Sequence, residues 1–125
     1  MHPKKIENIL KLNPFERYQY FIRKIADWEK TYTLVFPNGD YAISTIDDKT
    51  LFPLWSEIEF AEICRIDDWR DCEVLEIDFN RLEEIINFIR ENDFLINVFP
   101  TNKTGFVVTL DEFIRDLKEE LKNYE

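Results

Sequence analysis

Four helix-start signals divide this chain, and they constrain its fold more than any other feature. They stand at Asn13, Ser56, Asp78 and Thr109, whose side chains can accept hydrogen bonds from the free backbone N–H groups of a first helical turn. Three of them have Glu three residues later, which is the pattern of a capping box. Between these helices lie short segments that are apolar or alternate apolar and polar residues, so the sequence predicts strands there. The chain therefore combines helices and strands along its whole length.

Six segments are predicted to be strands. They are Thr31–Phe36, Tyr41–Ile46, Thr50–Leu54, Glu73–Ile77, Phe94–Phe99 and Gly105–Thr109. The first three are consecutive and favour an antiparallel meander that begins with a hairpin, while helices between the later strands allow parallel neighbours. The length predicts a single domain, residues 1–125, with residues 1–12 as an N-terminal helical extension. We therefore predict an α+β fold, a mixed sheet of about five to six strands with helices packed mainly on one face.

The pair Asn38-Gly39 predicts the turn of the first hairpin. This dipeptide suits a two-residue turn in which both residues need positive φ. Such a turn would pair Phe36 with Tyr41. Pro37 offers an alternative, in which the turn becomes a longer loop.

Apolar residues at helical spacing predict which helix faces point to the core. The stripe of the first long helix, which runs to about Glu29, consists of Phe15, Tyr18, Phe21, Ile22, Ile25 and Trp28. The stripe of the last helix consists of Phe113, Ile114, Leu117, Leu121 and Tyr124.

The chain is strongly acidic, with a net charge of −10 and a pI of about 4.6. Nucleic-acid binding depends on clusters of Lys and Arg, so this composition argues against a nucleic-acid partner. The same charge disfavours anionic membranes, and no apolar run approaches the length of a membrane span. An acidic surface suits solubility or a basic protein partner.

Two features of the sequence predict a cytoplasmic protein. The N-terminus lacks the apolar core of a signal peptide, and the two cysteines, Cys64 and Cys72, form neither a disulfide framework nor a CxxC pair. Reduced thiols are the ordinary state in the cytoplasm. Neither feature bears on the oligomeric state.

Residue types that carry out catalysis or bind metals lack partners here. The single histidine, His2, lies beside the N-terminus, which argues against catalytic triads and His-rich metal sites. Cys64 falls on the apolar face of its predicted helix, where cysteine packs as a small apolar residue. Cys72 lies near Asp71 and Glu73, whose charges raise the pKa of a thiol. The acidic run around it has neither the ligand spacing nor the Gly of a calcium loop. We therefore predict no catalytic residue, no cofactor and no metal.

The tryptophans Trp28, Trp55 and Trp69 stand at a helix end, a strand end and in a loop. Tryptophans in such places either cover the edge of a small core or line a pocket or an interface. The second alternative places a groove where the third strand ends and the acidic loop 66–72 begins. The candidate contact surface consists of Pro53, Leu54, Trp55, Glu57, Asp67, Asp68 and Trp69.

Two functions follow as hypotheses. The first is a non-enzymatic protein-binding module for a basic partner, of the kind that immunity and adaptor proteins form, because a charge of −10 would steer such a partner. The alternative is a small-ligand-binding protein or an enzyme that uses a groove near Trp55 and Trp69.

Several segments, in this order, resemble the bacterial family known as domain of unknown function 2750. They are E-R-Y-Q-Y-F-I-R-K-I-A-D-W-E (Glu16–Glu29), L-F-P-L-W with the following E-F-A-E-I-C (Leu51–Cys64), Trp69, I-D-F (Ile77–Phe79), V-F-P-T (Val98–Thr101) and the closing D-L-K-E-E-L-K-N-Y-E. The resemblance implies a bacterial stand-alone domain and no particular activity. Members of the family often have Trp in the hairpin, which this chain lacks, so no role of those tryptophans carries over. The stretch P-L-W-S-E-I-E-F-A is also similar, over a short length, to enhanced-serine-sensitivity-type domains.

Overall fold

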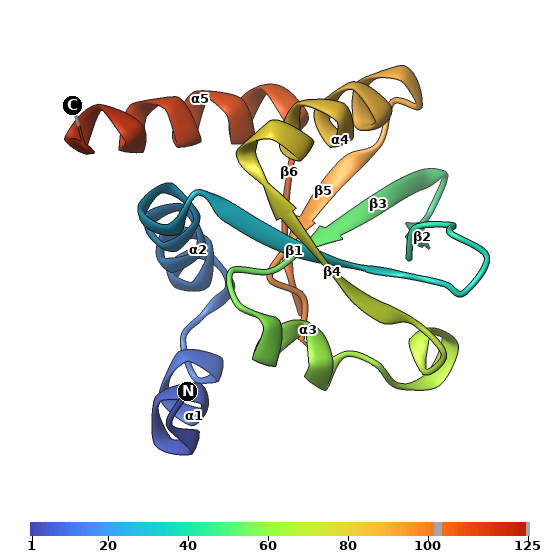
Figure 1. The fold of residues 1–125 in the computed structure, drawn as a ribbon, viewed down its shortest axis with the longest axis horizontal. Helices are drawn as coiled ribbons and strands as arrows, with labels where there is room; N and C mark the ends of the chain where they lie inside the picture. The colour runs from blue at the N-terminus through green and yellow to red at the C-terminus, as the bar shows by residue number, and fades with distance from the viewer. Residues whose placement is uncertain (102–103, 125) are drawn as a thin grey trace.

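The computed structural model describes residues 1–101 and 104–124, in which two helices and three strands are followed by a mixture of helices and strands (Figure 1). The helices are α1 (Pro3–Leu10), α2 (Pro14–Trp28), α3 (Ile58–Ile63), α4 (Phe79–Glu91) and α5 (Leu110–Leu121), with short 3₁₀ turns η1 (Asp67–Trp69) and η2 (Lys122–Tyr124). The strands are β1 (Lys30–Val35), β2 (Ser44–Ile46), β3 (Lys49–Leu54), β4 (Glu73–Asp78), β5 (Leu95–Val98) and β6 (Phe106–Val108). The predicted α+β class is confirmed.

The described strands form two hydrogen-bonded sheets where the sequence predicted one. Four strands lie in the order β2-β3-β5-β6, with β3 and β5 parallel and the other neighbours antiparallel. The mixed pairing is therefore confirmed. The predicted meander is only partly formed. Strands β2 and β3 pair antiparallel and Val35 of β1 bridges Tyr41, but the main ladder of β1 is the six-residue antiparallel pairing with β4. Reciprocal backbone hydrogen bonds between Tyr32 and Trp55 join this ribbon to the end of β3.

The turn after β1 takes the longer of its two predicted forms. The backbone N–H of Phe36 donates to the carbonyl oxygen of Asp40 over 2.8 Å, so the loop is wider than a two-residue turn. Tyr41 consequently bridges Val35 instead of Phe36. Pro37 lies inside this loop, where its fixed φ and missing N–H disturb no ladder.

Three of the four predicted helix starts are confirmed by their hydrogen bonds. The side chains of Asn13, Asp78 and Thr109 each accept a hydrogen bond from the backbone N–H three residues later. Asn13 and Thr109 complete reciprocal capping boxes. These caps place α2, α4 and α5 where the sequence predicted them.

The predicted cap at Ser56 is wrong. Helix α3 begins at Ile58, and the residue in the cap position is Glu57, which makes no capping hydrogen bond with its side chain. Glu57 instead accepts a hydrogen bond from the Tyr20 hydroxyl of α2, over 2.7 Å. This tertiary contact holds Glu57 in an extended conformation and starts the helix one residue later than the local pattern suggests.

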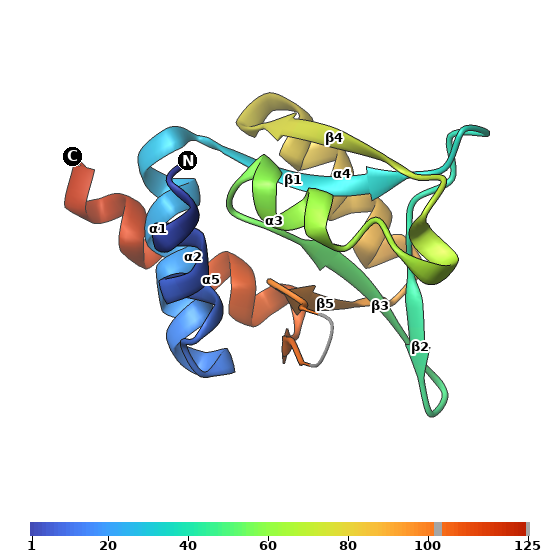
Figure 2. The same cartoon turned by 90° about the horizontal axis from the view of Figure 1, so that it is seen from below.

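The long helices form one packed layer. Helix α5 contacts both α2 and α4, and these helices reach the strands at β1, β4, β5 and β6. Helix α3 packs against β1 and β4, apart from α5 (Figures 1 and 2). The core between them is strongly aromatic. Its largest fully buried side chains include Phe21, Phe52, Trp55, Phe60, Phe99 and Phe113.

Three residues that were predicted to face the core lie on the surface. Phe15, Trp28 and Tyr124 are each more than half exposed. Phe15 and Trp28 lie in the first and last turns of α2, and Tyr124 lies in η2 after the end of α5, where a side chain has neighbours on fewer sides than in the middle of a helix. Trp28 is the last residue of α2, and Glu29 after it adopts the left-handed conformation that ends the helix.

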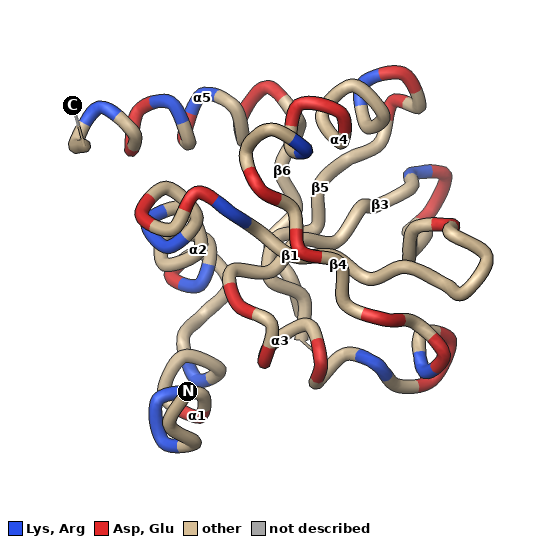
Figure 3. Tube along the Cα trace, viewed as in Figure 1, with Lys and Arg blue, Asp and Glu red and all other residues tan. Residues whose placement is uncertain are grey.

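Charged residues are distributed unevenly along the chain (Figure 3). The segment from Glu57 to Asp78 contains nine carboxylates and two arginines, whereas three lysines lie in or next to α1. None of the helices in the described part of the chain combines the length and the apolar character that a bilayer crossing requires.

Candidate functional site

The candidate contact surface divides into three places in the structure. Pro53, Leu54 and Trp55 lie at the end of β3, and all three are buried. Their backbone is held by β1, since the hydroxyls of Thr33 and Thr31 donate to the carbonyl oxygens of Pro53 and Trp55. These three side chains therefore belong to the core and present no surface to a partner.

Trp69 contacts this core on one side and lies at the surface on the other. Its ring stands perpendicular to that of Trp55, with 6.2 Å between the ring centroids. Trp69 is half-buried, and it covers Trp55 from the side of η1. The two tryptophans thus close over the core, and the groove predicted between them is filled by their own contact.

Trp69 also lines a surface hollow of about 530 Å³ on its outer side. Asp67 and Asp68 of η1 lie on the same hollow and are exposed, as are the apolar side chains Ile43 and Ile66. We call this surface the acidic hollow and define it by Ile43, Ile66, Asp67, Asp68 and Trp69. The structure therefore brings together the last three residues of the candidate surface with two isoleucines that sequence reasoning missed.

The isoleucines were missed because their neighbours come from distant segments. Ile43 precedes β2, and the sequence predicted it inside a regular strand of the first hairpin. Because the loop is longer than predicted, Ile43 lies outside β2 and lines the same hollow as η1. In a sequence that is rich in apolar residues, nothing distinguishes an isoleucine that will be exposed from one that will be buried.

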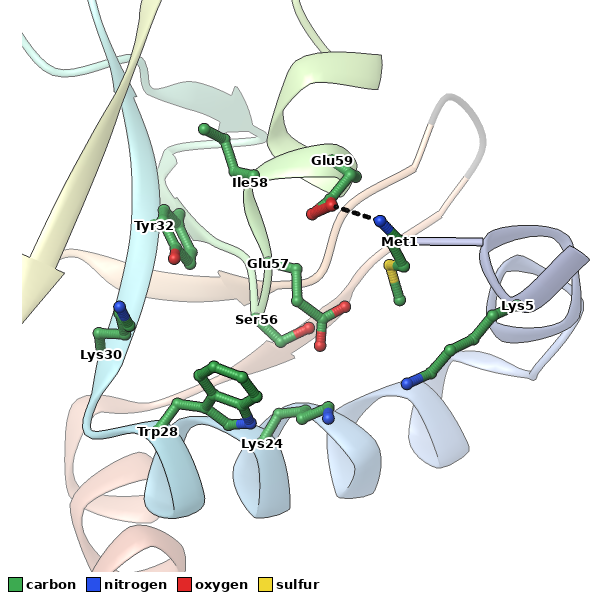
Figure 4. Close-up of a pocket in the computed structure, with 10 residues that line it drawn as sticks. All are labelled: Met1, Lys5, Lys24, Trp28, Lys30, Tyr32, Ser56, Glu57, Ile58 and Glu59. Carbon is green, nitrogen blue, oxygen red and sulfur yellow. Dashed lines mark ion pairs between the residues drawn. The ribbon is translucent and has the colours of Figure 1, made fainter. Parts of the chain in front are cut away.

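Glu57 lies in a different pocket, between α1, α2 and α3 (Figure 4). Its neighbours there include Lys5, Lys24, Trp28 and Ser56. Burial raises the pKa of the Glu57 carboxyl, although the hydrogen bond from Tyr20 and the charges of Lys24 and Lys5 act in the opposite direction. We call this pocket the Trp28 pocket. Its one signal in the sequence is the pair Lys24 and Trp28, one helical turn apart.

Neither cysteine is placed for nucleophilic chemistry. Cys64 is buried, and its Sγ donates to the carbonyl oxygen of Pro100. Burial raises the pKa of the Cys64 thiol to about 11, so the thiolate is scarce near neutral pH. Burial is also the largest cause that raises the pKa of Cys72, ahead of the charge of Asp71 that the sequence analysis named.

Acidic residues of the described segments do not gather into a metal site. No group of three or more His, Cys, Asp or Glu side chains in residues 1–101 and 104–124 has an arrangement that could hold a metal ion. Asp67, for example, is turned outward at the start of η1 with φ +52°. Its exposed carboxylate is available for contacts with another molecule.

Comparison with known proteins identifies the family and gives no activity. No curated protein matches this chain. The family model described as protein of unknown function (DUF2750) matches residues 18–117, which run from within α2 to within α5. The matched segment includes the whole acidic hollow and the α2 and α3 sides of the Trp28 pocket. Because the match covers most of the 125 residues, the chain belongs to the DUF2750 family of proteins of unknown function.

Proposed function

We propose that this protein is a non-enzymatic binding module, adaptor- or immunity-like, that contacts a basic protein partner through the acidic hollow. One observation carries the proposal: exposed carboxylates and exposed apolar side chains lie on the same hollow. Asp67 and Asp68 provide the charge, while Ile43, Ile66 and the outer side of Trp69 provide the apolar contact. Interfaces combine such an apolar, aromatic centre with a charged rim.

The charge of the hollow supports a basic occupant. No Lys or Arg lines the hollow within the described part of the chain. The two arginines nearest in sequence are engaged locally, since Arg65 pairs with Glu62 and Arg70 donates to the carbonyl oxygen of Asp67. A carboxylate-rich surface on a protein with a net charge of −10 accelerates association with a cationic partner.

The proposal places the interaction in the cytoplasm, where free thiols persist. Cys64 and Cys72 are both free in the structure. Reduced thiols are typical of that compartment.

The test uses the tagged protein as bait, with two variants that remove the same amount of charge. Asp67→Asn/Asp68→Asn removes the carboxylates of the hollow, and Asn tolerates the positive φ of Asp67. Glu83→Gln/Glu84→Gln is the matched control, because these exposed neighbours lie on α4. Captured proteins are identified by mass spectrometry, and the strongest stoichiometric candidate is then purified and titrated at several salt concentrations.

We expect a partner with net positive charge that binds the wild type and the α4 variant equally. The Asp67/Asp68 variant should bind at least about tenfold more weakly, and high salt should reduce the difference between them. Equal binding by both variants would remove the hollow from the interaction. An immunity role further predicts a toxin gene beside the gene for this protein, and an isolated gene would count against that role.

A further inference from the structure

The Trp28 pocket has the form of a small-molecule site and is not used by the proposed protein contact. It has a volume of about 360 Å³ and lies between three helices (Figure 4). Trp28 and Ile58 form apolar walls, and both are largely exposed to the pocket and solvent, at 61 % and 46 %. Ligand pockets typically combine such apolar walls with a few converging polar groups.

Two buried polar atoms at the base of this pocket lack partners. Ser56 is only 6 % exposed, and its hydroxyl makes no hydrogen bond to the described residues. The same holds for the Oε2 atom of Glu57, whose other oxygen accepts from Tyr20. Both side chains point into the pocket (Figure 4). Buried polar atoms are nearly always paired, and a carboxylate oxygen accepts only, so these atoms suit a ligand with N–H donors.

Two lysines converge on the same space from different helices. Lys5 extends from α1 and Lys24 from α2 toward the Glu57 carboxylate (Figure 4). Neither has an ion pair with a described residue, whereas Lys30 at the same pocket pairs with Glu76. The Nζ of Lys24 lies 5.5 Å from the centroid of the Trp28 ring. Their charges act on the Glu57 carboxyl, but neither lysine forms an ion pair with it among the described residues, so both suit the negative end of a ligand.

We propose that the Trp28 pocket binds a small zwitterion, namely a free α-amino acid with an apolar side chain. Its ammonium group donates to Glu57 Oε2 and to the Ser56 hydroxyl. Its carboxylate lies between Lys5 and Lys24, and its side chain packs on Trp28 and Ile58. A molecule that carries both an ammonium and a carboxylate matches a pocket that is lined by Glu57 and by the two lysines. The pocket is too small for a large ligand, since it stands at the lower end of the range of ligand sites.

Calorimetric titration of the full chain tests the ligand class. The protein carries its tag at the C-terminus, because Met1 lines the pocket. The probes are phenylalanine and leucine, together with phenethylamine, which lacks the carboxylate, and 3-phenylpropanoate, which lacks the amine. We expect saturable binding of at least one amino acid, with each single-charge analogue at least tenfold weaker. The proposal is overturned if no amino acid shows saturable binding at ligand concentrations up to about 10 mM. It is also overturned if an analogue that lacks one charge binds as tightly as the amino acid.

Variants assign the two ends of the ligand. Lys24→Gln should weaken the amino acid at least fivefold and leave phenethylamine unchanged. Its matched control, Lys118→Gln, replaces an exposed lysine on α5 and should change the affinity for neither ligand.

Glu57→Gln should weaken binding of the amino acid and leave binding of 3-phenylpropanoate unchanged. If loss of the Tyr20 contact unfolds the Glu57 variant, the comparison of Lys24→Gln with Lys118→Gln tests the proposal by itself, because Lys24 lies at the edge of the pocket and not in the core. Equal effects of the Lys24 and Lys118 variants overturn the proposal. The acidic hollow takes no part in these titrations, so their failure leaves the proposed protein contact standing.

Discussion

The indole N–H of Trp55 donates a hydrogen bond to the carbonyl oxygen of Pro100, with 2.9 Å between the two atoms. The Sγ of Cys64 donates to the same oxygen over 3.3 Å. One carbonyl group therefore holds the end of β3, the end of α3 and the segment after β5 together. This junction explains why a tryptophan stands at the end of β3, at a position that the sequence marks as a surface candidate.

Trp55→Phe should lower the free energy of unfolding by about 2 kcal/mol, because it removes a buried donor and leaves a cavity beside Trp69. Urea denaturation followed by circular dichroism measures the change. Trp28→Phe is the control, since Trp28 is largely exposed, and it should change stability by less than about 0.5 kcal/mol. Similar losses in the two variants would contradict the buried role of Trp55.

The hydroxyls of Thr109 and Ser56 should respond differently to removal. Thr109→Ala deletes the cap of α5 and should cost about 1 kcal/mol. Ser56→Ala deletes a buried hydroxyl that bonds to no described residue, so stability should stay within about 0.5 kcal/mol or rise. Thermal and urea unfolding of both variants measure this. A loss at Ser56 as large as that at Thr109 would restore the capping role that the sequence predicted.

The glycines are constrained for different reasons. Gly39 has φ +94° with open space around its Cα, so Gly39→Ala should cost about 1 kcal/mol through backbone strain. A Cβ on Gly105 would collide with the Asn97 side chain, so Gly105→Ala should cost about 1–3 kcal/mol through overpacking. Substitution of each glycine by Asn distinguishes the two causes, with stability measured by urea denaturation. Gly39→Asn should lose less stability than Gly39→Ala, because Asn tolerates positive φ, whereas Gly105→Asn should lose more than Gly105→Ala, because its side chain is larger. The reverse order would refute this assignment.

Stability should fall as the pH rises through the alkaline range. The Cys64 thiol has an ordinary pKa of 9.0 when unfolded, and burial raises that pKa to about 11 in the folded protein. Between these values the unfolded chain binds fewer protons than the folded one, so the free energy of unfolding decreases with pH. Tyr18 and Tyr20, whose pKa values burial also raises, add to this loss. Cys64→Ala should flatten the decrease between pH 9 and 11 in urea denaturation series. A slope that is equal in both proteins would exclude Cys64 as a source.

Local patterns predicted the helices, and tertiary contacts decided what the patterns left open. The caps at Asn13, Asp78 and Thr109 need only neighbours three residues away, so the sequence contains all their information. Ser56 satisfies the same rule but lies where the chain must stay extended to bring Glu57 to Tyr20. A pattern cannot report a contact between residues that far apart in sequence.

Strand pairing and the candidate sites show the same limit. The alternation in β1 predicts a strand but not that its partner is β4. Of the candidate surface, Asp67, Asp68 and Trp69 share a hollow because they are consecutive. Trp55 was placed with them by its residue type, although its buried position depends on Pro100 and Thr31. The Trp28 pocket depends on α1, α2 and α3 meeting, which no single segment encodes.

The parallel pair β3 and β5 at the centre of the larger sheet has a consequence for how the chain folds. Leu51 pairs with Leu95, and α3, β4 and α4 all lie between them in sequence. No local turn can nucleate this ladder, since the ends of a long loop must meet first. Folding kinetics should therefore be limited by closure of this loop, with α2, α4 and α5 gaining helical structure earlier. Truncation of Val98 in β5 should therefore slow refolding more than truncation of Ile22 in α2, when each change in folding rate is compared with the loss of stability that the same variant shows.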